Sequence, residues 1–239
     1  MTGDLSGLAL GPDDALFLDF DGTLAEIAPD PDSIFLDSAT ATALARLAAR
    51  LGDALALLSG RDLRDLALRT PAGLWRAGGH GLEIVGPDAP LPAPPPPPPE
   101  PVLAVLRAAC TPGVRLELKG PIAALHFRAV PQAEAACLAA AEAAAAGAPG
   151  YAVQPGKMVV EVKPAAAHKG AALARLMARP PFAGRRPIML GDDRTDEDAI
   201  AAAAQLGGLG VKVGPGPSAA ALRTRDPASV RAWLAREAG

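Results

Sequence analysis

The sequence is poor in aromatic residues and in cysteine, and it has no excess of positive charge. Only 3% of its 239 residues are aromatic, and Cys110 and Cys137 are its two cysteines. Two isolated cysteines are too few for a disulfide framework or a zinc site built on thiolates. The formal net charge of −3 provides no broad basic surface, so we do not expect nucleic acid to be a partner.

The sequence also lacks an apolar run long enough to span a bilayer, and it does not open with a charged segment followed by an apolar one. We therefore expect a cytoplasmic protein with no membrane partner, and we expect it to be a monomer. Half of the residues are hydrophobic, mainly alanine and leucine. At this length, that content is sufficient for a buried core.

Strand-like and helix-like patterns alternate through most of the chain. We expect strands at 15–22, 53–62, 187–193 and 208–214, and helices at 37–52, 169–178, 196–206 and 226–237. Residues 74–85 have the pattern of a strand, a glycine-rich corner and a second strand. This alternation predicts right-handed βαβ units, and thus an α/β, Rossmann-like core with a mainly parallel sheet.

The middle of the sequence has a different pattern. Residues 86–101 are rich in proline, which favours a stiff polyproline II spacer; a motif recognised by a proline-binding partner is the alternative. A helix, a hairpin at Gly120-Pro121, a second helix and a second hairpin around Pro155-Gly156 are expected to follow. We therefore predict a smaller α+β domain at 100–163, inserted into a core formed by 1–99 and 164–239.

Four polar clusters follow the expected strands or begin the expected helices. They are Asp19 with Asp21, Ser59 with Arg61, Lys169, and Asp192 with Asp193 and Asp196. In an open parallel sheet, ligands bind beyond the carboxyl ends of the strands, so we expect these side chains to meet. Each cluster alone is weak evidence, because a carboxylate in a turn is common. Together, and in this order, they indicate a site.

The chemistry that these groups could share is phosphoryl transfer through an aspartyl phosphate. Asp19 would attack phosphorus, and Asp21 would serve as general acid and then as general base. Lys169 and Ser59 would hold the phosphate oxygens. Thr23, Gly60 and Arg61 are further candidates for binding the substrate.

A hard divalent cation would relieve the repulsion between the carboxylates, and Mg²⁺ prefers such oxygen ligands. The candidate ligands are Asp19, Asp21, Asp192 and Asp196. Asp196 has a second possible role, because it stands at the start of an expected helix, where aspartate is a good cap.

These motifs carry a resemblance to a known superfamily. "DFDGTL", "SGR", "KG" and "GDDRTDED" resemble the four motifs of the haloacid dehalogenase superfamily, whose members use an aspartate nucleophile. Asp21 favours the phosphatase branch, and the position of the insertion between the second and third motifs resembles that of the superfamily's larger α/β caps.

A closer resemblance is to the trehalose-6-phosphate phosphatase family. It rests on "DFDGTLAEIAPDPDS", "SGRDLRDL", "GGHGLEI", "LELKGPIAALHFR", "KMVVEVKPAAAHKGAAL" and "GDDRTDEDAI". The resemblance implies hydrolysis of trehalose 6-phosphate with Mg²⁺, in trehalose biosynthesis. It also implies that cap residues bind the sugar, which here are Lys119, His126, Arg128 and Glu161.

Three other functions remain open at this point. The protein could be another capped sugar-phosphate phosphatase, of the sucrose-phosphate or mannosylglycerate-phosphate type. It could be a phosphosugar-binding regulator without turnover, although the intact set of Asp19, Asp21, Lys169 and Asp192 argues against this. It could also be a scaffold recruited through its proline tract.

Overall fold

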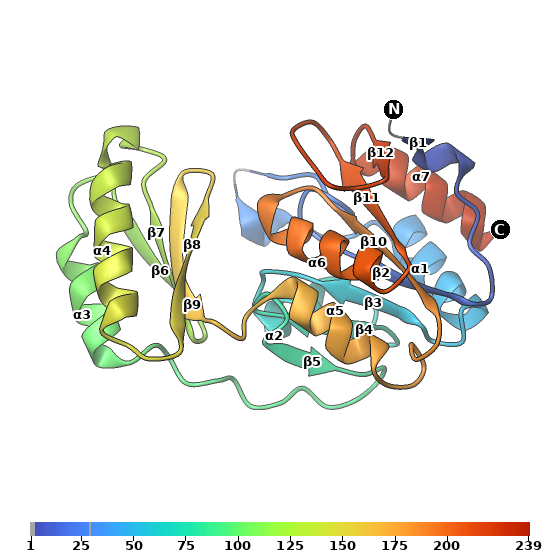
Figure 1. Ribbon diagram of the computed structural model, residues 1–239, viewed down its shortest axis with the longest axis horizontal. Coiled ribbons are helices and arrows are strands. Elements are labelled where there is room, and N and C mark those ends of the chain that lie inside the picture. Colours follow the sequence, from blue (N-terminus) through green and yellow to red (C-terminus); the bar gives the residue numbers. More distant parts are fainter. Residues whose placement is uncertain (1–2, 29) are drawn as a thin grey trace. The chain divides into compact units, whose positions relative to one another are not determined.

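The structure is a computed structural model that describes residues 3–28 and 30–239 (Figure 1). The chain divides into two compact units: the core unit, formed by Met1–Leu91 and His168–Gly239, and the insert unit, formed by Pro92–Ala167. The boundaries predicted from the sequence lie at 99/100 and 163/164, within the span of the insert unit. The unit boundary falls inside the proline-rich segment, whose residues from Pro92 on lead into α3; the first turn of α3 donates to the carbonyl oxygen of Pro99. Residues 1, 2 and 29 of the predicted core domain lie outside the described residues.

The core unit contains a single sheet and the helices that cover it. Its elements are β1 (Gly3–Asp4), η1 (Leu5–Gly7), β2 (Asp14–Leu18), η2 (Pro31–Ser33), α1 (Ser38–Arg50), β3 (Leu55–Leu58), α2 (Leu63–Arg69), β4 (Trp75–Gly78), β5 (Glu83–Val85), α5 (Lys169–Met177), β10 (Arg186–Gly191), α6 (Arg194–Gln205), β11 (Leu209–Val213), β12 (Leu222–Thr224) and α7 (Pro227–Ala238). The sequence patterns predicted the main strands and helices correctly. They missed β1 and β12, which are too short to show a period.

The eight strands lie in the order β1-β12-β11-β10-β2-β3-β4-β5, and all neighbours are parallel except β4 and β5. From β2 the chain proceeds through α1 to β3, whereas from β10 it proceeds through α6 to β11 in the opposite direction along the sheet. Right-handed crossovers in opposite directions place the two helices on opposite faces. The adjacent strands β2 and β10 therefore form the switch point, where the loops diverge and leave a crevice. The predicted α/β fold is confirmed.

The central strands are mostly apolar because helices cover both of their faces. All five residues of β2 and all four of β3 are buried. On one face α1 packs beside α7, and on the other α5 packs beside α6 (Figure 1). Asp226 caps α7 and Pro227 occupies its first turn.

The insert unit is an antiparallel sheet with two helices. Its elements are α3 (Glu100–Ala108), β6 (Arg115–Lys119), β7 (Ile122–His126), η3 (Pro131–Ala133), α4 (Glu134–Ala146), β8 (Tyr151–Gly156) and β9 (Val159–Pro164), with the strands in the order β6-β7-β9-β8. The helices α3 and α4 pack together, and their apolar residues form a second core with one face of the sheet. The helix–hairpin–helix–hairpin prediction is confirmed.

The turn of the second hairpin differs from the prediction. Pro155 and Gly156 belong to β8, and the turn lies at Lys157-Met158, where Met158 has a φ of +61°. Proline lacks an N–H, but β8 is an edge strand with a neighbouring strand on one side only. On its open side a missing N–H removes no hydrogen bond from the sheet. The sequence alone does not show which strand lies at the edge.

Across the part of the chain that the structure describes, no helix has the length and apolar character needed to cross a membrane.

Candidate active site

The predicted polar residues of the core unit lie together at the carboxyl edge of its sheet. Asp19 follows β2 directly, and Asp192 follows the neighbouring strand β10. Ser59 follows β3, and Lys169 is the first residue of α5. Asp19, Ser59 and Lys169 are each at most 3% exposed. The switch point therefore holds a buried cluster of charged and polar groups.

Lys169 links two carboxylates of this cluster. Its Nζ donates to Oδ1 of Asp19 at 2.7 Å and to Oδ1 of Asp196 at 2.7 Å. The side chains of Lys169 and Asp196 are 3% and 0% exposed, and a buried charge of this kind is tolerated only when it is paired. The two carboxylates raise the pKa of Lys169 well above its ordinary value, against the effect of burial, so its ammonium group stays charged.

Asp196 fixes the loop between β10 and α6. Its Oδ2 accepts from the backbone N–H groups of Asp192 and Asp193 at 3.0 and 3.1 Å, while the Asp193 carboxylate accepts from the N–H groups of Thr195 and Asp196. This is a reciprocal capping box, with Asp193 as the cap of α6. Both carboxylate oxygens of Asp196 therefore bind protein groups, and its part in the capping box is that of the third helical residue, with Asp193 as the cap.

Two further contacts hold Asp192. The Thr23 hydroxyl is fully buried and lies 3.5 Å from Oδ1 of Asp192. The ammonium of Lys212, on the adjacent strand β11, donates to the Asp192 carbonyl oxygen. Gly22 passes close by with a φ of +83°. The loop after β2 is thus fitted against the loop after β10.

The carboxylates of the cluster carry more negative charge than Lys169 can balance. Burial raises the pKa of Asp19 to about 7, although the Lys169 ammonium opposes this shift. Burial, together with the neighbouring Asp196 and Asp193 carboxylates, raises the pKa of Asp192 to about 7. Crowded carboxylates titrate late because each ionised group disfavours the next. A site of this kind favours an added cation.

Asp21 lies outside the buried cluster and is paired with an arginine. Arg61 donates from Nε and Nη2 to the two carboxylate oxygens of Asp21, each at 2.6 Å. The Asp21 side chain is 32% exposed, whereas that of Arg61 is 10% exposed. The structure thus places the predicted acid–base residue at the solvent edge of the site, and Arg61 against it.

The Ser59-Gly60-Arg61 turn rests on the glycine-rich corner after β4. The Ser59 hydroxyl accepts from the Arg61 N–H at 3.1 Å, and the N–H of His80 donates to the Ser59 carbonyl oxygen at 2.9 Å. His80 is buried, and a Cβ on Gly60 would lie 2.7 Å from its ring. Gly60 is therefore required for close packing against His80, a reason that the sequence did not reveal.

In the insert unit, three of the four predicted sugar-binding residues share a polar face of the sheet. Lys119 Nζ lies 3.6 Å from Oε1 of Glu161 and 3.9 Å from Oε2 of Glu117. Nε2 of His126 lies 2.6 Å from Oε2 of Glu117. Ala124 stands between Glu117 and Glu161 in the register. The fourth predicted residue, Arg128, lies beyond the end of β7 and is exposed.

The sequence model of the trehalose-phosphatase family matches residues 17–228. The chain belongs to this family. Among its relatives, a trehalose-6-phosphate phosphatase of Escherichia coli (strain K12) is 41% identical over 231 residues, with 92% of this chain and 85% of that protein covered. A probable trehalose-phosphate phosphatase of Sinorhizobium fredii is 42% identical over 237 residues, with 92% and 89% covered.

The fold of this family member also resembles solved structures. The C-terminal domain of a C. albicans trehalose-6-phosphate phosphatase superposes with a TM-score of 0.82 at 21% identity, covering 100% of this chain and 98% of that one. A haloacid dehalogenase-like hydrolase from Bacteroides thetaiotaomicron superposes with a TM-score of 0.67 at 18% identity, covering 93% and 98%. At these identities the likeness concerns the fold. The predicted haloacid dehalogenase-like core is thereby confirmed.

The residues of this family member fit a divalent cation. One carboxylate oxygen each from Asp19, Asp192 and Asp196 lies within 4.8 Å of the others. All three donors are oxygens, which a hard cation such as Mg²⁺ prefers to nitrogen or sulfur. Asp21, the fourth predicted ligand, directs its carboxylate to Arg61 instead.

Three residues near the predicted groups are not among the site residues predicted from the sequence. Asp65 pairs with Arg61, Glu117 contacts two of the predicted sugar-binding residues, and Lys212 holds the backbone of Asp192. Two had a usable signal: Asp65 stands four residues after Arg61, and Glu117 alternates with Lys119 along a strand. Lys212 had none, since only the sheet order places it beside β10.

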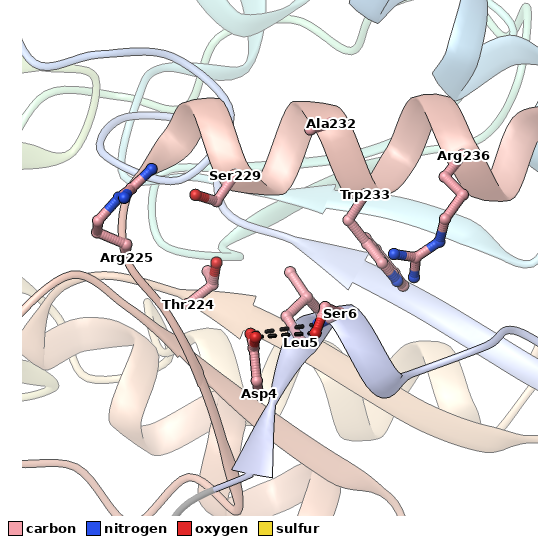
Figure 2. Close-up of a pocket in the computed structure, with 9 residues that line it drawn as sticks. All are labelled: Asp4, Leu5, Ser6, Thr224, Arg225, Ser229, Ala232, Trp233 and Arg236. Carbon is pink, nitrogen blue, oxygen red and sulfur yellow. Dashed lines mark hydrogen bonds between the residues drawn. The ribbon is translucent and has the colours of Figure 1, made fainter.

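The family member also has a cavity of about 410 Å³ near the edge of its sheet (Figure 2). It is lined by Asp4, Leu5, Ser6, Thr224, Arg225, Ser229, Ala232, Trp233 and Arg236. None of these is a predicted site residue. Their polar groups are engaged locally: Asp4 with Ser6, Arg225 and Ser229 with Asp226. We assign no function to this cavity.

Proposed function

We propose that the protein hydrolyses trehalose 6-phosphate to trehalose and inorganic phosphate, with Asp19 as nucleophile. The observation that carries the proposal is the buried Asp19–Lys169–Asp196 group at the switch point of the sheet, in a chain of the trehalose-phosphatase family. A carboxylate buried beside a fixed ammonium is poised to attack an electron-poor phosphorus atom.

In the first step, a carboxylate oxygen of Asp19 bonds to phosphorus and the bond from phosphorus to the sugar oxygen breaks. Asp21 donates a proton to that oxygen, so trehalose leaves as a neutral alcohol. Lys169 stabilises the negative charge on the phosphoryl oxygens, and the Ser59 turn offers further donors. Lys169 is held between two carboxylates, so it needs no rearrangement to do this.

In the second step, water attacks phosphorus and the bond between phosphorus and the Asp19 oxygen breaks. Asp21, which lost its proton in the first step, takes a proton from the water. Inorganic phosphate leaves, and both carboxyl groups return to their starting states.

Mg²⁺ is the proposed cofactor, held by Asp19 and Asp192. When bound, it neutralises charge on the phosphoryl group and on the carboxylates. Asp196 orients this pair by fixing Lys169 and the backbone of Asp192. The raised pKa values of Asp19 and Asp192 support a cation at this place.

We assign recognition of the sugar to the polar face of the insert sheet. Lys119, His126 and Glu161 offer donors and acceptors that hydroxyl groups bind well, and Glu117 joins them. Arg128 remains a proposed contact on the exposed turn after β7. Hydroxyl-rich ligands need several such partners, because each sugar hydroxyl both donates and accepts.

The remaining proposals concern the state of the protein. We propose a cytoplasmic monomer, with the sugar phosphate as its partner. Two free cysteines, Cys110 and Cys137, are compatible with a reducing compartment.

The test is phosphate release from a panel of sugar phosphates, with Mg²⁺ and with a chelator. We expect the highest kcat/KM for trehalose 6-phosphate, loss of activity with the chelator and its return with Mg²⁺. Asp19→Asn should lower kcat at least about 1,000-fold, since it removes the nucleophile. Asp13→Asn, an exposed position before β2, is the matched control and should stay within twofold of the wild type, roughly the effect of an ordinary surface substitution.

Other outcomes would select the alternatives. Higher activity on sucrose 6-phosphate, glucose 6-phosphate or a mannosylglycerate phosphate would assign the site to another sugar phosphate. Binding of trehalose 6-phosphate without phosphate release would make the protein a regulator. Full activity after deletion of residues 92–99, with no partner lost, would dispose of a scaffold role for the proline tract.

A further inference from the structure

A row of alternating charges runs from Asp21 along α2. Arg61, Asp65 and Arg69 are spaced four residues apart, so they lie on one side of the helix and its entry turn. Nη1 of Arg61 donates to Oδ2 of Asp65 at 2.8 Å, and Nε of Arg69 donates to Oδ1 of Asp65 at 2.8 Å. Each carboxylate in the row thus lies next to a guanidinium.

The far end of the row is anchored in the protein. The Arg69 side chain is only 5% exposed, and its Nη1 donates to the carbonyl oxygen of Ile34 at 2.6 Å. Its guanidinium also lies 4.8 Å from the ring centroid of Phe35. Asp65 is therefore held by a residue that cannot swing into solvent without breaking these contacts.

The near end of the row is equally constrained. The Arg61 guanidinium lies 5.3 Å from the ring centroid of Phe20, the buried residue between the two catalytic aspartates. Both backbone polar groups of Arg61 are hydrogen-bonded: its N–H donates to the Ser59 hydroxyl, and its carbonyl oxygen accepts from the N–H of Gly79. The two N–H donors that Arg61 presents to Asp21, Nε and Nη2, form a fork that is thus fixed in position before any substrate arrives.

Asp21 needs such support because it stands in a loop and is 32% exposed. An aspartate side chain has several staggered rotamers, and a proton donor that is misplaced by about 1 Å can lose about 100-fold in rate. Two parallel hydrogen bonds fix both the direction and the rotation of the carboxylate, which a single ammonium cannot do.

We propose that Arg61, held in turn by Asp65, is a positioning residue that keeps Asp21 in place for proton transfer. The ionised Asp21 accepts through both oxygens; when Asp21 carries the proton for the leaving oxygen, its unprotonated oxygen keeps the bond to Arg61 and its O–H is directed to the substrate. This inference rests on the proposed function and revises the part given to Arg61 by the sequence, that of a substrate ligand. A phosphate that bound the same fork would have to displace Asp21 from it, because both carboxylate oxygens accept from Nε and Nη2.

The test exploits leaving groups of different basicity. A sugar alkoxide must be protonated as it leaves, whereas p-nitrophenolate leaves readily without a proton. Single-turnover rates at saturating substrate would be measured for trehalose 6-phosphate and p-nitrophenyl phosphate. We expect Arg61→Met to slow the sugar substrate about 100-fold or more, and the aryl substrate less than about tenfold, with little change in the half-saturating concentrations.

Two milder variants and a control keep the test independent of misfolding. Arg61→Lys keeps the positive charge but lacks the two parallel N–H donors of the guanidinium. Asp65→Asn keeps the size of the side chain but removes the charge that pairs with Arg61. Each should slow the reaction of the sugar substrate by an intermediate factor, roughly 3- to 30-fold, and that of the aryl substrate by less. Arg64→Met is the control: Arg64 is on the same helix and pairs with Asp62 and Glu83, which do not belong to the row, so this variant should stay within about twofold.

Equal losses for both substrates would overturn the inference and make Arg61 a phosphate ligand or a structural residue. An unchanged saturating rate with a raised half-saturating concentration for the sugar substrate would overturn it in favour of substrate binding. Failure of the wild-type protein to hydrolyse trehalose 6-phosphate is a separate result, which would instead reject the proposed function.

Discussion

Gly22 illustrates how strongly a single position in the site is constrained. Its φ of +83° lies in the region that favours glycine, and a Cβ there would lie 2.3 Å from Oδ2 of Asp192. An added Cβ would therefore force the Asp192 carboxylate, which lies 3.5 Å from the Thr23 hydroxyl, out of its present place. The absence of a side chain at Gly22 is thus part of the geometry of the site.

We predict that Gly22→Ala lowers kcat about 100-fold, the cost of moving a reacting group by about 1 Å. Gly216→Ala is the matched control, since Gly216 has a φ of +100° with no atom within 4 Å of an added Cβ. The control carries the same backbone strain, about 1–2 kcal/mol, without the clash. Steady-state kinetics and thermal melts of both variants separate the effects; similar activity in the two would contradict the prediction.

At the scale of the element, α1 depends on its N-terminal cap. The Asp37 carboxylate accepts from the N–H of Thr40 at 2.7 Å and from its hydroxyl at 2.8 Å. These bonds satisfy a donor that the first turn of a helix otherwise leaves without a partner. Since α1 packs against α7, the cap also supports the covering layer on one face of the sheet.

We predict that Asp37→Ala lowers the free energy of unfolding by about 1 kcal/mol at pH 7, whereas Asp37→Asn, which can still cap, changes it by a few tenths. The bonds to Thr40 lower the pKa of Asp37 below its ordinary 3.8. The charged cap is therefore fully stabilising above that value, and its contribution is lost as the pH falls through the lower pKa of the folded state. Urea denaturation between pH 7 and pH 3 measures this.

The alanine penalty should shrink only below about pH 4, where the cap begins to be protonated. A penalty that stayed constant down to pH 3 would show that the charge of Asp37 does not contribute.

At the scale of the whole molecule, the two units have separate hydrophobic cores. The clusters of buried residues in the core unit and in the insert unit have no member in common among the described residues. Leu16 belongs to the first and Leu106 to the second, and both are fully buried. Units with separate cores can unfold at different free energies.

We predict that Leu106→Ala, which removes about 2–5 kcal/mol of packing free energy, raises amide hydrogen exchange within 92–167 and leaves the core unit protected. Leu16→Ala is the matched variant and should raise exchange within 1–91 and 168–239. Mass-spectrometric exchange on the full chain distinguishes the two patterns. Faster exchange throughout the chain in both variants would mean that the two units unfold as one.

The sequence predicted much of the site because its signals are local. Asp19, Ser59 and Asp192 each follow an apolar strand, and the parallel sheet brings such strand ends to one edge. The pairing of Asp21 with Arg61 could not be read in this way, because the two residues are 40 positions apart and either could face solvent. Which side chain meets which depends on packing.

The helices and strands likewise divide into those that the sequence predicts and those that it does not. The alternation of strands and helices, the proline tract and the caps of α1 and α7 follow from local propensity and periodicity, which the sequence carries residue by residue. The position of the second hairpin turn and the short strands β1 and β12 did not follow, since they depend on edge position and on neighbouring strands.

By itself, then, the sequence determined the α/β class, the inserted domain, the family resemblance and the set of acidic and basic residues at the strand ends. Only the tertiary structure decided how those charges pair: Lys169 between Asp19 and Asp196, and Arg61 on Asp21. The physical reason is the separation along the chain over which each effect acts. Backbone propensity acts over a few residues, whereas the pairing of buried charges depends on strand order and on the side chains that strands and helices bring together.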